Sequence, residues 1–563
     1  MGQKTDPAFD VIVVGSGASG GWAAKRLSEA GVSVALVEAG RAHRPDDFRE
    51  HRRAFELPYG NLSRELIRKT RPRQSEVSAC NEFTADWFVN DLEEPYTTTA
   101  DKPFSWQGRT RLVGGRTNVW GRQSYRFSEQ DLKGRSFDGE GADWPLSYAD
   151  LAPYYDLVER YVGVSGQAEQ VPELPDGQFQ PAMPMTCSEV RLRARVKKAL
   201  CRTVTIGRTA NLTQALNGRA ACHYCGPCDR GCVTRSYFNS ALTTVPDALA
   251  TGKCTLITNA MVHQVLMDAD HRRATGIRYV DRVTRASREL RARVVILCAQ
   301  SLESVRILLN SATRQQPNGL ANSSGALGRY LMDHLWVAGG AEGEFPDFPE
   351  RATMDRAARP NGIYVIRFRN TPSSPRSGKF VRGYGFQGGN RVAFNFRAPG
   401  FGAAYKKAVL DPVVSVQLSG FGECLPYYSN YVEIDRSTVD VYGIPVLRIH
   451  MTWGANERAM IPDMAETAVE MLEAAGARNI RPFTVPDRVP GYAIHELGIA
   501  RMGADSRDSV LNQFQQAHDV GNLFVMDGAS FPSSACQNPT LTIMALAVRS
   551  CDHLLEEMKR GNL

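Results

Sequence analysis

The first forty residues constrain the fold of this chain more than any other segment. A β-branched run is followed by Gly15, Gly17 and Gly20 in a G-x-G-x-x-G pattern, then by a helical stretch and a second apolar run that ends at Glu38. This order predicts strand, glycine loop, helix and parallel strand, the arrangement of a dinucleotide-binding βαβ unit. The predicted strands are residues 10–14 and 33–37, and the predicted helix is residues 22–30.

Each residue of this pattern has a physical role. Gly15 makes the tight turn, Gly17 lets a pyrophosphate approach the backbone, and Gly20 lets the helix pack closely on the strand. The helix N-terminus offers free N–H groups to the phosphates, and Glu38 can accept hydrogen bonds from ribose hydroxyls. The alternative is a tight turn in a doubly wound sheet that binds no ligand.

A second G-x-G-x-x-G match stands at Gly383–Gly388. Alternating apolar and polar residues follow it, which predicts a strand where the phosphate-binding motif requires a helix. We therefore expect one dinucleotide site, and no NAD-dependent activity that would need a second.

Composition places the chain among soluble globular proteins. Its 563 residues suggest two to four domains, with 43% apolar and 23% charged residues. No run of about 18 apolar residues predicts a membrane span. The net charge of +7 is spread along the chain, so we expect no nucleic-acid binding.

The remaining segments predict further α/β structure and a β-rich unit. Short strands fill residues 254–299 and precede a helix, whereas residues 336–480 mix alternating strands with a long helix over residues 457–475. Near the C-terminus, a buried strand over residues 522–526 ends at Asp527, and a helix starts at Thr540.

Four of the twelve cysteines fall within eleven residues. Cys222, Cys225, Cys228 and Cys232 have the spacing C-x2-C-x2-C-x3-C, which is typical of iron–sulfur ligation in bacterial ferredoxins. The proline that usually follows the fourth cysteine is replaced by Val233. A zinc site and free or disulfide-bonded cysteines remain the alternatives.

Taken together, the motifs resemble those of the glucose–methanol–choline (GMC) oxidoreductases over nearly the whole chain. Besides the N-terminal pattern, the matching pieces are Gly114-Gly115, Val294–Leu308, Asn322–His334, His495-x-x-Gly498 and Asp527 through Pro539. The resemblance implies FAD as cofactor and alcohol oxidation by hydride transfer to flavin N5. It is greatest to bacterial members acting on sugars, such as glucoside 3-dehydrogenases and the catalytic subunits of glucose, gluconate and fructose dehydrogenases.

The resemblance also assigns roles to single residues. It implies that His495 and Asn538 are catalytic and that Asp527 lies near the ribityl–pyrophosphate. The expected cofactor-binding residues are Gly15, Gly17, Gly20, Glu38, Gly114, Gly115, Asn118, Val262, Asp527, Asn538 and Thr540.

The sequence departs from the family pattern at three places. Ile499 replaces the threonine of the H-x-x-G-T pattern, and Gln300 follows Ala299 where the family has Ala-Ala-Gly. Val119 stands where some relatives bind FAD covalently through a histidine, so we expect non-covalent FAD.

The expected chemistry explains the residue types. An alcohol carbon gives up hydride readily only as its hydroxyl loses a proton, which a neutral imidazole such as that of His495 can take. The Asn538 amide can hold the alcohol oxygen and orient the C–H bond. The alternatives are a histidine hydrogen-bonded in a loop and a turn asparagine before proline.

The expected fold class is α/β, with a Rossmann-like FAD-binding domain of the type shared by GMC enzymes and p-hydroxybenzoate hydroxylase, and a β-rich substrate-binding domain. We expect the FAD-binding domain at residues 1–150, 205–335 and 490–563, with a cysteine-rich, cluster-binding segment at 220–233. We expect the substrate-binding domain at residues 151–204 and 336–489.

The expected function is oxidation of a secondary alcohol of a sugar, at C3 of glucosides, with electrons leaving through a 3Fe-4S or 4Fe-4S cluster to a cytochrome or quinone. The alternatives are a glucose- or gluconate-type dehydrogenase acting at another carbon, an oxygen-using oxidase, and a non-catalytic electron-transfer module. The resemblance further implies a small export subunit and a cytochrome c subunit. Because no export signal is recognised in the sequence, we expect periplasmic location by export with that partner, with the cytoplasm as the alternative.

Overall fold

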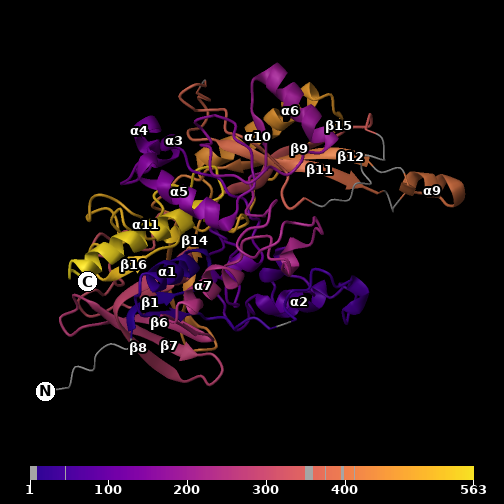
Figure 1. Ribbon diagram of the computed structural model, residues 1–563. Helices are drawn as coiled ribbons and strands as arrows, with labels where there is room; N and C mark the ends of the chain where they lie inside the picture. The colour runs from indigo at the N-terminus through magenta and orange to yellow at the C-terminus, as the bar shows by residue number, and fades with distance from the viewer. Residues whose placement is uncertain (1–8, 45, 349–358, 375, 395–397, 411–412) are drawn as a thin grey trace.

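The computed structural model describes residues 9–44, 46–348, 359–374, 376–394, 398–410 and 413–563. Two large sheets, each covered by helices, dominate the molecule (Figure 1). The first has the strand order β5-β2-β1-β8-β7-β6, with β16 paired to β8. Its strands are β1 (Phe9–Val14), β2 (Val34–Val37), β5 (Cys254–Ile257), β6 (Ala260–Met267), β7 (Ala274–Asp281), β8 (Ser287–Leu297) and β16 (Leu523–Val525).

The first sheet is parallel at its centre. β1 pairs in parallel with β2 and with β8, β2 pairs with β5, and β16 pairs with β8, while β6, β7 and β8 form an antiparallel meander. Helices α1 (Ala18–Glu29), α7 (Thr244–Ala250) and α11 (Thr540–Lys559) pack together beside this sheet (Figure 1). The predicted βαβ unit and the predicted C-terminal strand and helix are thus confirmed.

The second sheet is antiparallel, with the order β15-β9-β12-β11-β10-β4. α10 (Ala455–Ala474) packs on it, and α6 (Cys187–Leu200) packs on α10 (Figure 1). The second glycine match lies on a strand of this sheet, as its sequence context predicts. The strands are β4 (Val204–Ile206), β9 (Leu335–Glu344), β10 (Ile363–Val365), β11 (Tyr384–Ala393), β12 (Val413–Gly422) and β15 (Arg478–Thr484).

Smaller elements complete the fold. A three-stranded sheet contains β3 (Thr97–Thr98), β13 (Tyr431–Val439) and β14 (Pro445–His450). The other helices are α2 (Arg64–Thr70), α3 (Glu129–Leu132), α4 (Gly134–Asp138), α5 (Tyr148–Val162), α8 (Ser301–Asn310) and α9 (Gly402–Leu410). None of the helices described is both long and apolar enough to cross a membrane.

The division into domains stays a prediction, and two elements lie close to its boundaries. β4 spans residues 204–206 and pairs with β10 of the second sheet. α5 starts at residue 148 and packs against α11, next to the first sheet.

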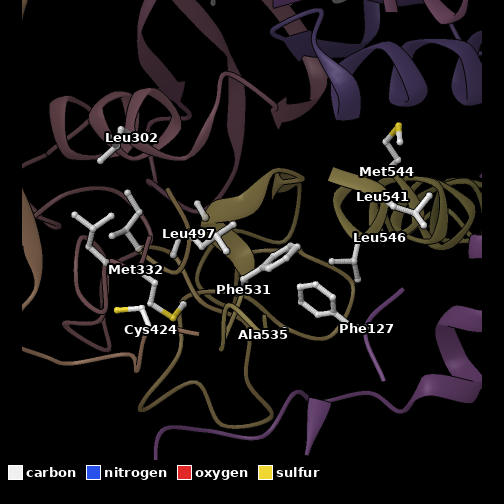
Figure 2. Packing of buried hydrophobic residues seen from close by; sticks show 14 of the residues in the cluster. Phe127, Leu302, Met332, Cys424, Leu497, Phe531, Ala535, Leu541, Met544 and Leu546 are labelled. Atoms are coloured by element: carbon white, nitrogen blue, oxygen red, sulfur yellow. The ribbon is translucent and has the colours of Figure 1, made fainter. Parts of the chain in front are cut away.

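One hydrophobic core contains side chains from loops near both sheets and from helices α8 and α11. Met332, Leu497 and Phe531 are almost fully buried and lie between Leu302 of α8 and Leu541 of α11 (Figure 2). Fully burying a side chain of this size contributes about 1.5–3 kcal/mol. This packing fixes the chain directly after His495 and the segment that precedes Asn538.

Candidate active site

The three glycines of the N-terminal pattern lie in different surroundings. Gly15 has a φ of +98°, and a Cβ there would collide with the carbonyl oxygen of Cys298. A Cβ on Gly20 would collide with the carbonyl oxygen of Gly15, whereas a Cβ on Gly17 would meet no protein atom within 4 Å. The fold itself therefore requires Gly15 and Gly20, while Gly17 borders open space.

Glu38 is buried at the end of β2 and organises the loops around it. Its Oε2 accepts hydrogen bonds from the backbone N–H of Ser16 at 3.0 Å and from Ser16 Oγ at 2.6 Å, and its Oε1 accepts one from Gly40 N at 2.7 Å. Ser16 Oγ accepts in turn from the N–H of Gly114. A carboxylate has about four acceptor positions, so one remains for a ribose hydroxyl.

The Gly114-Gly115 loop packs against the N-terminal glycines rather than forming an isolated surface turn. A Cβ on Gly115 would lie 3.6 Å from the Cα of Gly17. The buried side chain of Asn118 donates to the carbonyl oxygens of Val113 and Gly115. Asn118 thus holds the loop in place from behind.

A cavity with about 1280 Å³ of empty space, including the open solvent at its mouth, lies along these loops. It is lined by the ends of the first sheet, by the Gly115–Thr117 turn and by the segment around His495. Of the predicted residues, Gly15, Gly17, Glu38, Gly115, Val262, His495, Asp527 and Thr540 line this cavity. Gly20, Gly114, Asn118 and Asn538 are outside its lining.

His495 is half-buried and faces this cavity. Its backbone N–H donates to Asp333 Oδ1 at 3.0 Å, and its Nδ1 lies 3.2 Å from Nδ1 of His334. Burial of the ring, followed by the influence of His334 and Arg116, holds the pKa of His495 well below 6.5. The imidazole is therefore neutral at physiological pH and can accept a proton.

Asn538 is buried directly before the N-terminus of α11. Its Oδ1 accepts a hydrogen bond of 2.7 Å from Nε2 of Gln387 on β11. This contact leaves the Nδ2 group of Asn538 as the donor for another partner.

Asp527 lines the cavity at the end of β16. Its carboxylate accepts hydrogen bonds from Ser304 Oγ at 2.5 Å and from the N–H of Ala529 at 3.0 Å. Burial raises the pKa of Asp527 to about 6. Asp527 thus combines a polar carboxyl with an apolar environment at the cavity wall.

Sequence reasoning missed a polar chain in the cavity wall. Glu496 accepts from both terminal nitrogens of Arg116, at 2.6 and 3.0 Å, and from Nε2 of Gln300 at 3.0 Å. Gln300 has a φ of +82°, a value that favours glycine, at the place where the family pattern departs from Ala-Ala-Gly. The departure from Ala-Ala-Gly at Gln300 could be seen in the sequence, but it did not identify Glu496 as the partner of Gln300.

The cysteine segment contacts the loop that follows β2, where the N–H of Arg49 donates to the carbonyl of Arg230 at 2.9 Å. Cys222, Cys225, Cys228 and Cys232 are free thiols. Burial, followed by the charges of the other three, raises the pKa of Cys225 to about 11, so the four occupy one neighbourhood. As placed, no group of three or more His, Cys, Asp or Glu side chains in the described ranges is arranged to hold a metal ion.

The fold and the cavity are those of a dinucleotide-binding protein. The GMC oxidoreductase family models match residues 9–336 and 426–547. The chain therefore belongs to the GMC oxidoreductase family, whose members oxidise alcohol groups and use FAD. The sugar-dehydrogenase resemblance and the α/β fold predicted from the sequence are confirmed at this level.

Three relatives illustrate the range of the family. A 2-methyl-1,2-propanediol dehydrogenase of Mycolicibacterium austroafricanum is 30% identical, covering 97% of this chain and 95% of the relative. The fructose dehydrogenase large subunit of Gluconobacter japonicus is 26% identical, covering 98% of each chain. A C-glycoside 3-oxidase of Microbacterium trichothecenolyticum is 28% identical over 54% of each chain.

The residues present fit FAD. The open space at Gly17 accommodates a pyrophosphate, and the acceptor position remaining on Glu38 suits a ribose hydroxyl. The cavity extends from there to His495, as a dinucleotide reaching the reacting carbon requires.

Replacing Gly17 by Val tests the pyrophosphate position. We expect a folded protein whose affinity for FAD falls at least about tenfold, or ~1.4 kcal/mol, because the side chain would occupy ligand space. FAD titration monitored by flavin fluorescence measures this loss. Gly521→Val is the matched control, since a Cβ there also meets no atom within 4 Å but lies outside the cavity. Equal FAD binding by Gly17→Val and the control would contradict the assignment.

The lowered pKa of His495 predicts an unusual pH profile. A base whose pKa lies below 6.5 stays unprotonated as the pH falls, so anaerobic flavin reduction should keep its rate between pH 8 and pH 6. Stopped-flow measurements across this range test the expectation. A rate that halves at pH 6.5 or above would show that the imidazole is not held neutral.

Proposed function

We propose that this protein oxidises a secondary alcohol of a sugar, with C3 of a glucoside as the preferred position. The observation that carries the proposal is that one cavity is lined by both the glycine loop and His495. Bound FAD would supply the hydride acceptor. The chain itself would bind the sugar, orient its C–H bond and remove the hydroxyl proton.

His495 and Asn538 have different roles at the substrate hydroxyl. The neutral imidazole of His495 takes the proton, a step that typically contributes about 10²–10⁴-fold to the rate. Asn538 is outside the cavity lining but directly precedes Pro539 and Thr540, which belong to it, and we propose that its Nδ2 group donates to the alcohol oxygen while its Oδ1 accepts from Gln387. Together these contacts orient the carbon that loses hydride.

Two relatives support a sugar substrate, and one supports the position. The fructose dehydrogenase subunit and the C-glycoside 3-oxidase act on sugars or glycosides by name, and the latter at position 3. The diol dehydrogenase supports a second candidate, a small branched diol, because it is 30% identical over almost the full length.

Anaerobic reduction of the FAD-loaded protein by a panel of alcohols tests the proposal. The panel contains methyl glucosides, glucose, gluconate, fructose and 2-methyl-1,2-propanediol. We expect the glucosides to reduce the flavin fastest and NMR of the product to locate a ketone at C3. Reduction by the diol alone, or a ketone at another carbon, would contradict the proposal, and no reduction by any alcohol would favour a non-catalytic module. Rapid reoxidation of the reduced protein by air would identify an oxidase.

We further propose that electrons leave through an iron–sulfur cluster held by the four clustered cysteines. Their spacing and shared neighbourhood support this. The adjoining chain also reaches the cavity: Cys232 Sγ lies 3.2 Å from Ser236 Oγ, and the carbonyl of Phe238 accepts from Nε1 of Trp120, which lines the cavity. The segment that follows Cys232 therefore contacts a residue of the cavity wall.

The surface beside the cysteines supports docking of an electron-accepting subunit such as a cytochrome c. The N–H of Arg49 donates to the carbonyl of Arg230 at 2.9 Å, which ties residues 48–53 to the cysteine segment. Further along the same segment, Phe55 and Leu62 are exposed by 83% and 86%. We propose that these apolar side chains form part of the surface on which the partner docks.

We also propose periplasmic residence, reached with a partner that carries the export signal. Because the cysteines must be reduced when a cluster is inserted, assembly would precede transfer to an oxidising compartment. Fractionation of cells with and without the partner tests this, and periplasmic protein in cells that lack any partner would contradict it.

Replacing Cys225 and Cys228 by Ser tests the cluster. In wild-type protein made and purified without oxygen, we expect iron and acid-labile sulfide. The double variant should lose both, keep flavin reduction by substrate, and reduce a cytochrome at least about tenfold more slowly, because two thiolate ligands are missing. Cys187→Ser/Cys201→Ser is the matched control, since both cysteines are exposed and outside the segment. Stoichiometric zinc without iron, or an unchanged cytochrome rate, would contradict the proposal.

A further inference from the structure

The loop that carries His495 is fixed against the segment that ends at His334. Met332 and Leu497 exchange two backbone hydrogen bonds of 3.0 Å, as in an antiparallel pair. Asp333 is fully buried, and its carboxylate accepts three backbone N–H groups of the loop, one of them from His495. The Met332 and Leu497 side chains lie close together in the core (Figure 2). These contacts place the two histidine rings in a defined relation.

Three contacts surround the imidazole of His334, which is buried. Its ring stacks on Phe421, with centroids 4.5 Å apart and planes at 28°. Its Nε2 lies 3.1 Å from the carbonyl oxygen of Ser534, and its Nδ1 lies 3.2 Å from Nδ1 of His495. Nε2 of His334 thus lies within hydrogen-bond distance of the Ser534 carbonyl, with the backbone of Ala535 and Gln537 also close to the ring, and Nδ1 lies within hydrogen-bond distance of His495.

These two distances determine where the protons lie. A carbonyl oxygen only accepts, so Nε2 of His334 carries a proton and donates to Ser534. Burial lowers the pKa of His334 to about 3, so its ring is neutral and its Nδ1 is an acceptor. The partner on that side, Nδ1 of His495, must then be the donor. The remaining nitrogen of His495, Nε2, is left with a free lone pair.

We propose that His334 is a positioning residue that fixes His495 in the Nδ1–H tautomer, so that Nε2 is the basic atom that receives the substrate proton. This assignment rests on the proposed function only for the last step, because the tautomer follows from the contacts alone. The chain of donors runs from Nδ1 of His495 to His334 and from His334 to the carbonyl of Ser534.

The pair of His334 and His495 differs from a histidine–carboxylate pair in the charge of the residue that orients the base. A carboxylate would stabilise the imidazolium and raise the pKa of the base, whereas neutral His334 orients the ring without adding negative charge. The other ionisable groups near the pair are Asp333, on the backbone side, and Arg116, which is paired with Glu496. The base therefore stays neutral but correctly oriented.

Substitutions of His334 distinguish a role in orienting the His495 ring from a role in packing against Phe421. His334→Phe keeps a ring to stack on Phe421 but removes the acceptor for His495. His334→Asn offers an amide oxygen at the position of Nδ1 and so can restore that acceptor. His450→Phe is the matched control, because His450 is also buried and stacked, on Tyr431, but its ring nitrogen contacts Glu433 rather than His495.

For FAD-loaded protein we expect His334→Phe to slow anaerobic flavin reduction at least about tenfold with an unchanged FAD content, because without an acceptor for Nδ1–H the imidazole of His495 would mostly adopt the tautomer that presents Nε2–H to the substrate. His334→Asn should recover most of the rate, and His450→Phe should match wild type. A wild-type rate in His334→Phe would overturn the proposal. Equal losses in the Phe and Asn variants would also overturn it, since they would indicate a packing role alone.

A readout without turnover tests the tautomer directly. In protein labelled with ¹⁵N on histidine, we expect the His495 signals, assigned by their loss in His495→Ala, to show a protonated Nδ1 and an unprotonated Nε2. His334 should show the opposite pattern. A protonated Nε2 on His495 would overturn the proposal, even if the Phe variant fails to fold. Because this spectrum needs no substrate, it remains decisive if the proposed sugar oxidation proves wrong.

Discussion

The structure depends on the parallel pairing of β1 with β2 and β8. The register aligns Val14 with Val37 on one side and with Leu297 on the other, and β16 continues it by aligning Val525 with Leu297. The carboxyl ends of four strands thus meet at one edge. In parallel sheets this edge is where ligands bind, because loops diverge there and helix N-termini point at it.

Each residue that follows one of these strands contributes to the cavity. Gly15 follows β1, Glu38 follows β2, Gln300 comes shortly after β8, and Asp527 comes shortly after β16. The second sheet adds its part from the other side, through Gln387 on β11, which orients Asn538. The candidate active site therefore lies at the carboxyl-terminal edge of the first sheet, with Asn538 in contact with the second sheet through Gln387.

The sequence predicted the parts whose role is local. The glycine pattern, Glu38 and the strand that ends at Asp527 are readable because their geometry is set within a few residues. Gly20 was expected to bind cofactor, but its environment gives it the packing role that the pattern also assigns to it. The four cysteines were likewise found by spacing, which cannot fix their ligand geometry.

The missed contacts join residues that are far apart in the sequence. His334 is 161 positions from the predicted His495, and Arg116 is 380 positions from Glu496. Their contacts depend on how loops from both sheets pack, and no periodicity or motif encodes that packing. Only the unusual Gln300, with a positive φ in place of glycine, marked this wall of the cavity in the sequence.

The central claim is that His495 is the base of an alcohol oxidation carried out in the FAD cavity. Single-turnover, anaerobic reduction of FAD-loaded His495→Ala by the best substrate of the wild type tests it most directly. We expect a normal FAD content and a reduction rate lower by about 10²–10⁴-fold, because the variant lacks the proton acceptor. A variant with normal FAD content that is reduced at the wild-type rate would contradict it.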